Sequence, residues 1–231
     1  LGLRWEQEMD KPKGNKWVLL ISLVVGLSCG VHFMALLTIP SIGFIYYFKK
    51  HQNITLKSFI VANVVIVSIL LFIFKLLLPY TLAFFGKTEI FMVNNLGLPF
   101  NSGTLFAFFV IVAVFYFGLR YTKQKGLVIA NTILLSTLFI LIGFSTWMML
   151  PIRANANVPI NENKPSDAAE VLAYYNREQY GEQHLFYGPQ FSDKYSGLDE
   201  NNPYLDEKPN YERDYIQNKY IITNNILFHY T

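Results

Sequence analysis

The chain has 231 residues, of which 52% are apolar and only 15% are charged, whereas about 25% of residues are charged in an ordinary soluble domain. Its net charge of +3 hides a segregation, because residues 1–150 carry 12 basic and 4 acidic residues and residues 151–231 carry 7 and 12. Between Lys11 and Asn161 the only acid is Glu89. A soluble single domain is therefore excluded, and we expect no nucleic-acid partner, because membrane topology accounts for the positive charge.

Four apolar runs, at 17–48, 58–85, 104–119 and 127–150, predict an α-helical integral membrane protein. A helix crosses the hydrocarbon with about 20 residues, so the last two runs predict one crossing each. The run 58–85 is long for one crossing, and Pro79 with Tyr80 predicts a bend near its outer end. Lys75 lies about one turn before that bend and is expected to snorkel outward.

The first run, 17–48, is either one helix of about 48 Å or a hairpin that breaks near residues 30–32. With a hairpin, ten lysines and arginines fall on the cytoplasmic side and three on the other, whereas a single crossing gives seven and six. The positive-inside rule favours the hairpin. We therefore expect five crossings in residues 17–150, with residues 1–16 cytoplasmic. Gly26 and Gly30, four residues apart, predict close approach of a neighbouring helix.

The tail, residues 151–231, reads as the start of an extracytoplasmic α/β domain. Asp167 as N-cap, with Glu170 three residues later, predicts a capping box and a helix over about 168–180 that ends at Gly181. Residues 184–187 and 220–223 read as short strands, and the polar stretch 192–214 is predicted to be loop. One helix and two strands bury too little surface to fold alone.

Three segments in this order resemble a known family. They run from Gly26-Leu27-Ser28-Cys29-Gly30-Val31-His32 to Lys50, then over Pro151-Ile152-Arg153-Ala154-Asn155-Ala156-Asn157, and finally over Tyr175-Asn176-Arg177-Glu178-Gln179-Tyr180-Gly181. Together they are similar to large multi-spanning membrane proteins, mainly from Bacteroidetes, that are related to a eukaryotic protein O-mannosyltransferase. The resemblance covers most of residues 15–225.

The resemblance implies a multi-spanning glycosyltransferase fold in a bacterial inner membrane. The charge bias places the N-terminus on the cytoplasmic side and the tail on the periplasmic side. The implied reaction moves a mannose-like sugar from a polyprenyl phosphate to a Ser or Thr hydroxyl of an exported protein. In that family a carboxylate in an N-terminal Trp-Asp-x-Gly-Glu-like segment is the expected general base. This sequence has no such segment. We therefore expect the chain to be an internal fragment that is inactive alone.

Two charged residues are candidates for a site. Glu89 lies in a predicted outer loop, 86–103, and could stand near the sugar-transfer site or simply pair with Lys87. Arg153 follows the last predicted helix on the outer side. Its guanidinium could hold the phosphate of a lipid-linked sugar, or it could anchor the chain to lipid head groups or to Glu162.

Three further candidates are polar and uncharged. His32, at the tip of the first hairpin, could contact a donor phosphate or transfer a proton, or it could bond a backbone carbonyl. Asn155 and Asn157 could bind sugar hydroxyls, although asparagines more often fix local turns.

The single cysteine, Cys29, excludes a disulfide framework and a cysteine-based metal site. His32 has no ligand at metal spacing, so we expect no metal, and the sequence indicates no cofactor.

Two functions of other classes remain open beside a membrane glycosyltransferase. One is a non-enzymatic membrane anchor or assembly component, for which ten of the 15 tyrosines, all after residue 170, would form an extracytoplasmic binding tail. The other is a transporter, which ranks last because the helices carry few polar residues and show no inverted repeat.

Overall fold

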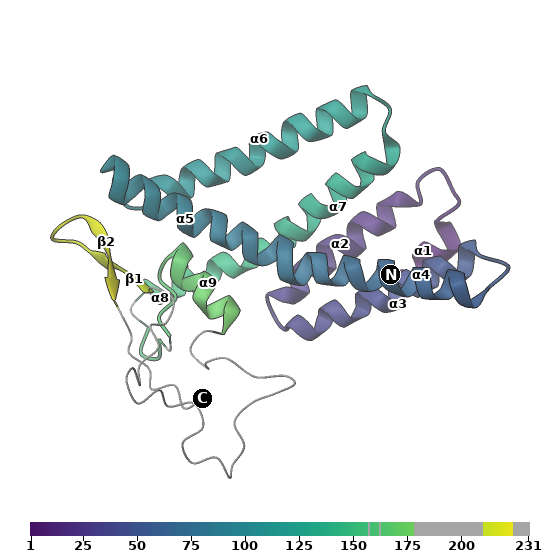
Figure 1. The fold of residues 1–231 in the computed structure, drawn as a ribbon, viewed down its shortest axis with the longest axis horizontal. Helices are drawn as coiled ribbons and strands as arrows, with labels where there is room; N and C mark the ends of the chain where they lie inside the picture. The colour runs from purple at the N-terminus through teal and green to yellow at the C-terminus, as the bar shows by residue number, and fades with distance from the viewer. Residues whose placement is uncertain (157, 162, 178–209, 224–231) are drawn as a thin grey trace, which may run out of the picture.

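The computed structural model describes residues 1–156, 158–161, 163–177 and 210–223, which form a helical bundle with a small two-stranded sheet (Figure 1). The α-helices are α1 (Gly2–Glu8), α2 (Asn15–Cys29), α3 (Thr38–Lys50), α4 (Leu56–Leu71), α5 (Leu78–Leu96), α6 (Ser102–Gln124), α7 (Val128–Phe144), α8 (Met149–Ala154) and α9 (Ala168–Asn176). Short 3₁₀ helices cover Phe33–Leu37 and Ser145–Met148, a π-helical turn covers Phe72–Leu77, and the strands are β1 (Asn210–Asp214) and β2 (Lys219–Thr223).

Three helices are long and apolar enough to cross a membrane: Leu56–Leu96, Ser102–Gln124 and Val128–Ala154. Most of their apolar surface is exposed, which suits contact with lipid chains. The prediction of an α-helical membrane protein is therefore supported. Five crossings are not established, because α2 has 15 residues and α3 has 13, fewer than the roughly 20 that a perpendicular crossing needs.

The first apolar run is broken where the sequence predicts. The helix α2 ends at Cys29, His32 has an extended backbone, and α3 runs back toward the end of the bundle that holds the N-terminus, where it contacts α1 and α4 (Figure 1). The α2–α7 contact then depends on small residues, since a Cβ at Gly26 would overlap the backbone of Ile140, and one at Gly143 would lie 2.5 Å from the Leu23 carbonyl oxygen. The predicted close helix approach at Gly26 is thus confirmed.

The long helix Leu56–Leu96 does not stop near Pro79. Proline lacks an N–H and its ring crowds the carbonyl one turn earlier. A π-helical turn precedes Pro79 and accommodates it, with Leu78 N–H donating to the Ile73 carbonyl. The helix then continues to Leu96 and ends at Gly97, whose φ of 65° suits glycine. The predicted outer loop over 86–103 is therefore wrong, because the connection between α5 and α6 covers only residues 97–101.

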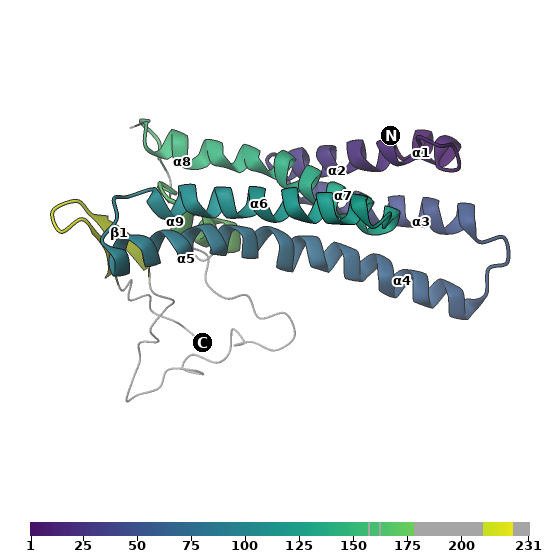
Figure 2. The same ribbon diagram turned by 90° about the horizontal axis from the view of Figure 1, so that it is seen from above.

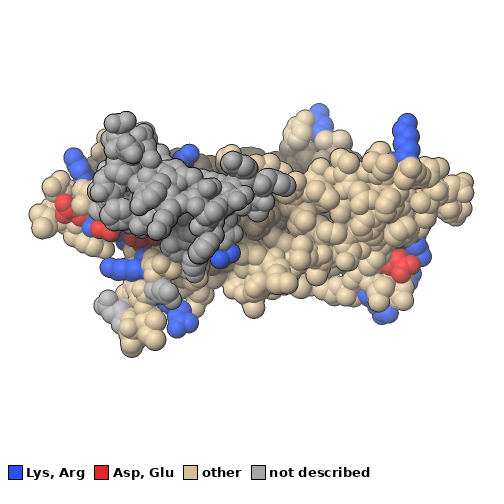
Figure 3. All heavy atoms as spheres, turned by 60° about the horizontal axis from the view of Figure 1, so that its bottom comes forward, with Lys and Arg blue, Asp and Glu red and all other residues tan. Residues whose placement is uncertain are grey.

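The bundle has two different ends. One end, here called the cationic end, holds the N-terminus, the α3–α4 loop and the α6–α7 loop (Figures 1 and 2). The other, called the tail end, holds the α5–α6 loop, α8 and the β1–β2 hairpin. At the cationic end Lys49 Nζ lies 3.4 Å from Glu6 Oε1, and Lys50 pairs with Asp10. On the face drawn in Figure 3, a broad stretch without charged side chains separates the charged groups of the two ends.

The described part of the tail includes the helix α9 and the β1–β2 hairpin, called the hairpin below. Asp167 caps α9 as predicted, but Glu170 Oε2 accepts from the backbone and hydroxyl of Ser166, one residue before the cap. The helix ends at Asn176, earlier than predicted, because Arg177 adopts a left-handed conformation with φ 58°. The strand at 220–223 is confirmed, whereas the predicted loop is wrong over 210–214, because these residues pair with β2. The predicted strand at 184–187 lies outside the described residues.

Aromatic packing joins α9 to the membrane helices. The Tyr175 ring lies 5.2 Å from Phe33 and 5.5 Å from Trp147, between ring centroids. Its hydroxyl donates to the Phe74 carbonyl at 2.7 Å, on the π-helical turn. Trp147 Nε1 in turn donates to the Cys29 carbonyl at 3.0 Å. The tail is thereby fixed to the middle of the long helix. An α/β domain is not established, since the described residues contain only a two-stranded sheet.

We predict that Gly26→Ala lowers the thermal unfolding temperature of the protein in detergent, because the added methyl group overlaps α7 and overpacking costs about 1–3 kcal/mol. Gly118→Ala is the matched control: its Cβ would meet only the flexible Leu134 Cδ1, at 3.4 Å. Alanine also has the higher helix propensity, so this control should not lower the unfolding temperature. Equal unfolding temperatures of the two variants would contradict the α2–α7 contact.

Candidate functional site

A group of polar side chains, three of them buried, lies at the tail end, where α5, α6, the start of α9 and the β1–β2 hairpin meet. We call it the tail-end cluster, and it consists of Glu89, Asn101, Thr104, Asp167, Arg213 and Tyr220. Its carboxylates, Glu89 and Asp167, are 2% and 4% exposed. Acids are almost never buried this deeply unless they are paired or hydrogen-bonded, so their partners determine what the cluster can do.

The carboxylate of Glu89 receives donors from two elements. It accepts from Asn101 N–H at 2.5 Å, from Thr104 N–H at 2.8 Å and from the Thr104 hydroxyl at 3.1 Å. These groups lie at the start of α6, where free N–H groups and the helix dipole favour an anion. The close approach requires Gly103, because a Cβ there would overlap the backbone of Thr88 and Glu89. The lone acid of the membrane half therefore binds the neighbouring helix.

The hairpin is docked on the same carboxylate. The Tyr220 hydroxyl donates to Glu89 Oε1 at 3.3 Å and accepts from Arg213 Nε at 3.0 Å. The Arg213 guanidinium also donates to Asn101 Oδ1 at 3.0 Å and lies 5.4 Å from the centroid of the Phe100 ring. Arg213 and Tyr220 face each other across the two strands. One cross-strand pair thus joins the hairpin to the α5–α6 connection.

A second contact on α5 fixes the backbone of the hairpin. The Asn94 side-chain amide donates to the Tyr220 carbonyl at 2.9 Å, and its oxygen accepts from Tyr220 N–H at 2.8 Å. An amide side chain that pairs with both backbone groups of one residue imitates a neighbouring strand. The backbone N–H and carbonyl of Tyr220, on the outer edge of β2, therefore find their hydrogen-bond partners in a side chain of α5.

Asp167 is the least satisfied member of the cluster. Its Oδ1 caps α9, accepting from Ala169 N–H at 2.9 Å and Glu170 N–H at 3.0 Å. Its Oδ2 lies 3.7 Å from Arg213 Nε and accepts no hydrogen bond within the described part of the chain. Burial raises the pKa of Asp167 to about 6, against the opposing effect of the capping N–H groups and Arg213. Burial also raises the pKa of Tyr220 above its usual value.

In this conformation the cluster holds the β1–β2 hairpin against α5 and the start of α6. Four hydrogen bonds occupy the Glu89 carboxylate, which leaves it no open face from which to take a proton from a substrate. Removal of any one donor would leave the buried carboxylate with fewer hydrogen bonds, which is costly. The geometry therefore supports a positioning role for Glu89. Among the described residues, no group of three or more His, Cys, Asp and Glu side chains could hold a metal ion.

The other predicted residues that the structure describes lie on the surface, Arg153 and Asn155 toward the tail end and His32 at the α2–α3 connection. Arg153 is exposed in the last turn of α8. Asn155, also exposed, donates to the Pro151 and Ser166 carbonyls at 2.8 Å each, which is the backbone role that the sequence left open. His32 is exposed and caps the following 3₁₀ helix, with Nδ1 accepting from Met34 N–H at 3.1 Å. Asn157 lies outside the described residues.

The structure brings some of these residues together and separates others. Asn155 bonds Ser166, the neighbour of Asp167, so it adjoins the tail-end cluster that contains Glu89. His32 precedes Phe33, which packs on Tyr175 together with Trp147 and does not belong to the tail-end cluster. Sequence reasoning missed Tyr220 as a partner of Glu89, and Arg213 as a partner of Tyr220 and Asp167. No local signal marks them, because 131 residues separate Tyr220 from Glu89.

Comparisons with known proteins match two parts of the chain. Residues 1–55, which cover α1 to the start of α4, match the family model described as the protein O-mannosyl-transferase TMEM260 N-terminal domain. Residues 181–230 match a family of unknown function, DUF8416. No curated protein and no solved structure matches the chain. The first match supports a relationship to protein O-mannosyltransferases, and the second covers the hairpin that docks on Glu89.

We predict that Glu89→Gln loosens the hairpin, because the neutral amide loses charge-assisted hydrogen bonds and offers only one acceptor oxygen. Amide hydrogen exchange of residues 210–223 should become faster. Glu212→Gln is the matched control, since Glu212 pairs with Ile221 on the same hairpin and is exposed. Unchanged exchange in Glu89→Gln would show that the carboxylate does not hold the hairpin.

The raised pKa of Asp167 predicts a pH dependence of stability. Because the folded chain binds this proton more tightly than the unfolded chain, the group stabilises the fold below about pH 4 and loses that contribution as the pH rises through about 6. The free energy of unfolding should therefore fall between pH 4.5 and pH 7.5 more in the wild type than in Asp167→Asn, which keeps a capping side chain. Denaturant unfolding in detergent at both pH values measures this difference, and identical pH dependence would contradict it.

Proposed function

We propose that this chain is part of a membrane glycosyltransferase that moves a mannose-like sugar from a polyprenyl phosphate to Ser or Thr hydroxyls of exported proteins. The observation that carries the proposal is the match of residues 1–55 to the N-terminal domain of a protein O-mannosyl-transferase. The helices that could span a membrane agree with it, because a lipid-linked sugar donor is held in the bilayer.

The proposal includes five crossings of a bacterial inner membrane, with the N-terminus cytoplasmic and the tail periplasmic. The loops at the cationic end carry most basic residues of the membrane half, as the positive-inside rule requires of a cytoplasmic side. The helices α2 and α3 would cross as a pair. Helices shorter than the hydrocarbon are accommodated by local thinning of the bilayer.

In the proposed reaction a carboxylate takes the proton of the acceptor hydroxyl as its oxygen attacks the anomeric carbon, and the polyprenyl phosphate departs with the electrons of the broken bond. The acidic segment that the resemblance assigns to this base is not among the 231 residues. The chain would supply groups around the donor. Arg153 is suited to the donor phosphate because its fork is exposed at the tail end.

Other residues would have supporting roles in this proposal. His32 would face the donor from the α2–α3 connection. Its Nδ1 accepts the capping hydrogen bond from Met34 N–H, and this bond does not involve Nε2. Asn155, with Asn157, would shape the segment that carries Arg153, since Asn155 ties α8 to Ser166. Glu89 would position the hairpin and not react.

We predict that Arg153→Ala, introduced into the protein that contains this sequence, abolishes O-linked hexose on exported proteins, or lowers it at least tenfold. Losing a charge-assisted phosphate contact costs about 1.5–3 kcal/mol, and tenfold corresponds to 1.4 kcal/mol. Glycopeptide mass spectrometry of a deletion strain, complemented with each variant, measures the change. Arg120→Ala is the matched control, because Arg120 is also exposed but lies near the cationic end of α6.

The outcomes separate the two open functions. Loss of the modification on deletion of the gene, with recovery by the wild type and not by Arg153→Ala, supports the transferase. Normal glycosylation in the deletion strain would contradict the proposal and favour a membrane anchor whose tyrosine-rich tail binds a partner. Full activity of Arg153→Ala alone would remove this arginine from the donor site.

A further inference from the structure

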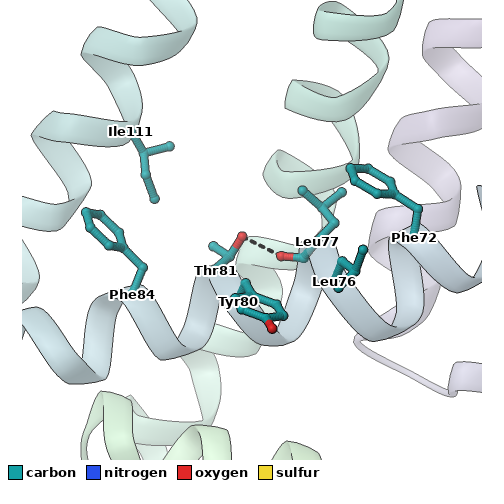
Figure 4. Close-up of a pocket in the computed structure, with 7 residues that line it drawn as sticks. All are labelled: Phe72, Leu76, Leu77, Tyr80, Thr81, Phe84 and Ile111. Carbon is teal, nitrogen blue, oxygen red and sulfur yellow. Dashed lines mark hydrogen bonds between the residues drawn. The ribbon is translucent and has the colours of Figure 1, made fainter.

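Two hollows on the surface of the helices differ in their lining. One, of about 420 Å³, lies between the helix Leu56–Leu96 and Ile111 of α6. Figure 4 shows that its lining is hydrocarbon apart from the hydroxyls of Tyr80 and Thr81, and the Thr81 hydroxyl donates to the Leu77 carbonyl at 2.6 Å. Without a charged group in its lining, this groove offers nothing that distinguishes one lipid head group from another.

The second hollow, of about 310 Å³, has a charged residue in its wall. It lies at the cationic end, between the start of α2, the end of α6 and the start of α7, and we call it the basic pocket. The residues that line it include Asn15, Leu19, Lys123, Asn131, Thr132 and Leu135. Its volume falls in the range of pockets that hold small ligands, about 300–1,000 Å³.

Two side-chain hydrogen bonds hold the three helices around the basic pocket. Asn15 Nδ2 on α2 donates to the Thr132 hydroxyl of α7 at 3.3 Å, and Asn131 Nδ2 on α7 donates to the Thr122 hydroxyl of α6 at 2.9 Å. Thr122 is 6% exposed and donates in turn to the Gly118 carbonyl at 2.9 Å. The wall of the pocket is therefore built mainly from helices that are tied to one another.

Lys123 has no counter-ion in the described part of the chain. It is exposed in the last turn of α6, and none of the ion pairs there involves it. The N-cap of α7, Leu127, also lacks a side chain that accepts from the first N–H groups of that helix, so the positive end of the helix dipole adds to the charge of the lysine. The basic pocket therefore favours an anionic group.

The lining of the basic pocket changes from polar to apolar along the helices. Residues 102–119 of α6 carry no charge and rise by about 27 Å, close to the roughly 30 Å of the hydrocarbon, so Lys123 stands at head-group depth when α6 crosses the bilayer. Leu135 lies about 10 Å farther along α7 than Val128, and Leu19 lies one turn inside the start of α2. The pocket therefore runs from Lys123 into the hydrocarbon, and its polar and apolar parts adjoin.

We propose that the basic pocket binds one anionic phospholipid, with its phosphate at Lys123 Nζ and the first methylene groups of one chain against Leu19 and Leu135. The lysine supplies the charge that selects an anionic head group, as basic pockets between membrane helices do. The apolar inner part requires a chain, which a free phosphate lacks. The inference does not depend on sugar transfer, because the lipid is held and not consumed.

The test measures which lipids stay bound. The protein that contains this sequence is reconstituted in nanodiscs with equal amounts of phosphatidylglycerol and phosphatidylcholine, and the lipids retained after release into detergent are counted by native mass spectrometry. We expect phosphatidylglycerol to be retained about fivefold over phosphatidylcholine, the factor that corresponds to about 1 kcal/mol for one basic residue at an anionic surface. Lys123→Gln should abolish this preference, and Lys123→Arg should keep it.

Lys125→Gln is the matched control, because Lys125 is also exposed, follows Lys123 by two residues and does not line the basic pocket. It removes the same charge from the same end of the protein and should leave the preference unchanged. No preference in the wild type, equal losses in Lys123→Gln and Lys125→Gln, or loss of the preference in Lys123→Arg would overturn the proposal. A preference that is lost in Lys123→Gln and kept in Lys123→Arg would show that the positive charge at this position selects the lipid.

A second arm tests the apolar part of the basic pocket. Leu135→Trp should fill it and lower the retention of phosphatidylglycerol at least fivefold. Leu76→Trp is its matched control, because Leu76 is 47% exposed and lines the uncharged groove of Figure 4, and it should leave the retention unchanged. Glycerol phosphate in excess should not displace the bound lipid, because it lacks the chain. Displacement by glycerol phosphate, or equal retention in both tryptophan variants, would overturn the proposed position of the chain.

Discussion

The continuity of the helix Leu56–Leu96 past Pro79 is the constraint on which the remaining structure depends. A helix of 41 residues is about 61 Å long, roughly twice the thickness of the hydrocarbon. The π-helical turn at Phe72–Leu77 absorbs the proline and lets the second half continue. That half, α5, contacts α6, α9 and β2, so the described part of the tail depends on the helix continuing to Leu96.

The described part of the tail contacts the long helix in two ways. Near the π-helical turn, Tyr175 combines aromatic packing with a hydrogen bond to the Phe74 carbonyl. At the far end of α5, Glu89 and Asn94 hold the hairpin through Tyr220. A two-stranded hairpin is at best marginally stable alone in water. The order of the hairpin therefore derives from buried polar contacts with helices that precede it by more than 100 residues.

The residues of the candidate site were only partly predictable. Glu89 could be singled out because it is the lone acid of a long apolar stretch. The predicted loop was wrong, because the chain stays helical to Leu96 and packs against α6 at Gly103. Asp167 was predictable as a cap because capping is local. Arg213 was not, because its strand is polar and only the pairing with Tyr220 and the proximity of Asn101 give it a role.

Local information was enough for the sequence alone to determine the membrane character, the segregation of charge, the break after Cys29 and the cap of α9. Each of these depends on the composition of a run or on residues within one or two helical turns. Only the tertiary structure decided that α5 extends to Leu96, that β1 exists and that Glu89 holds the β1–β2 hairpin through Tyr220. The reason is physical: a buried carboxylate and a polar strand are stable only where distant groups supply their hydrogen bonds, and such partners leave no pattern in the sequence around them.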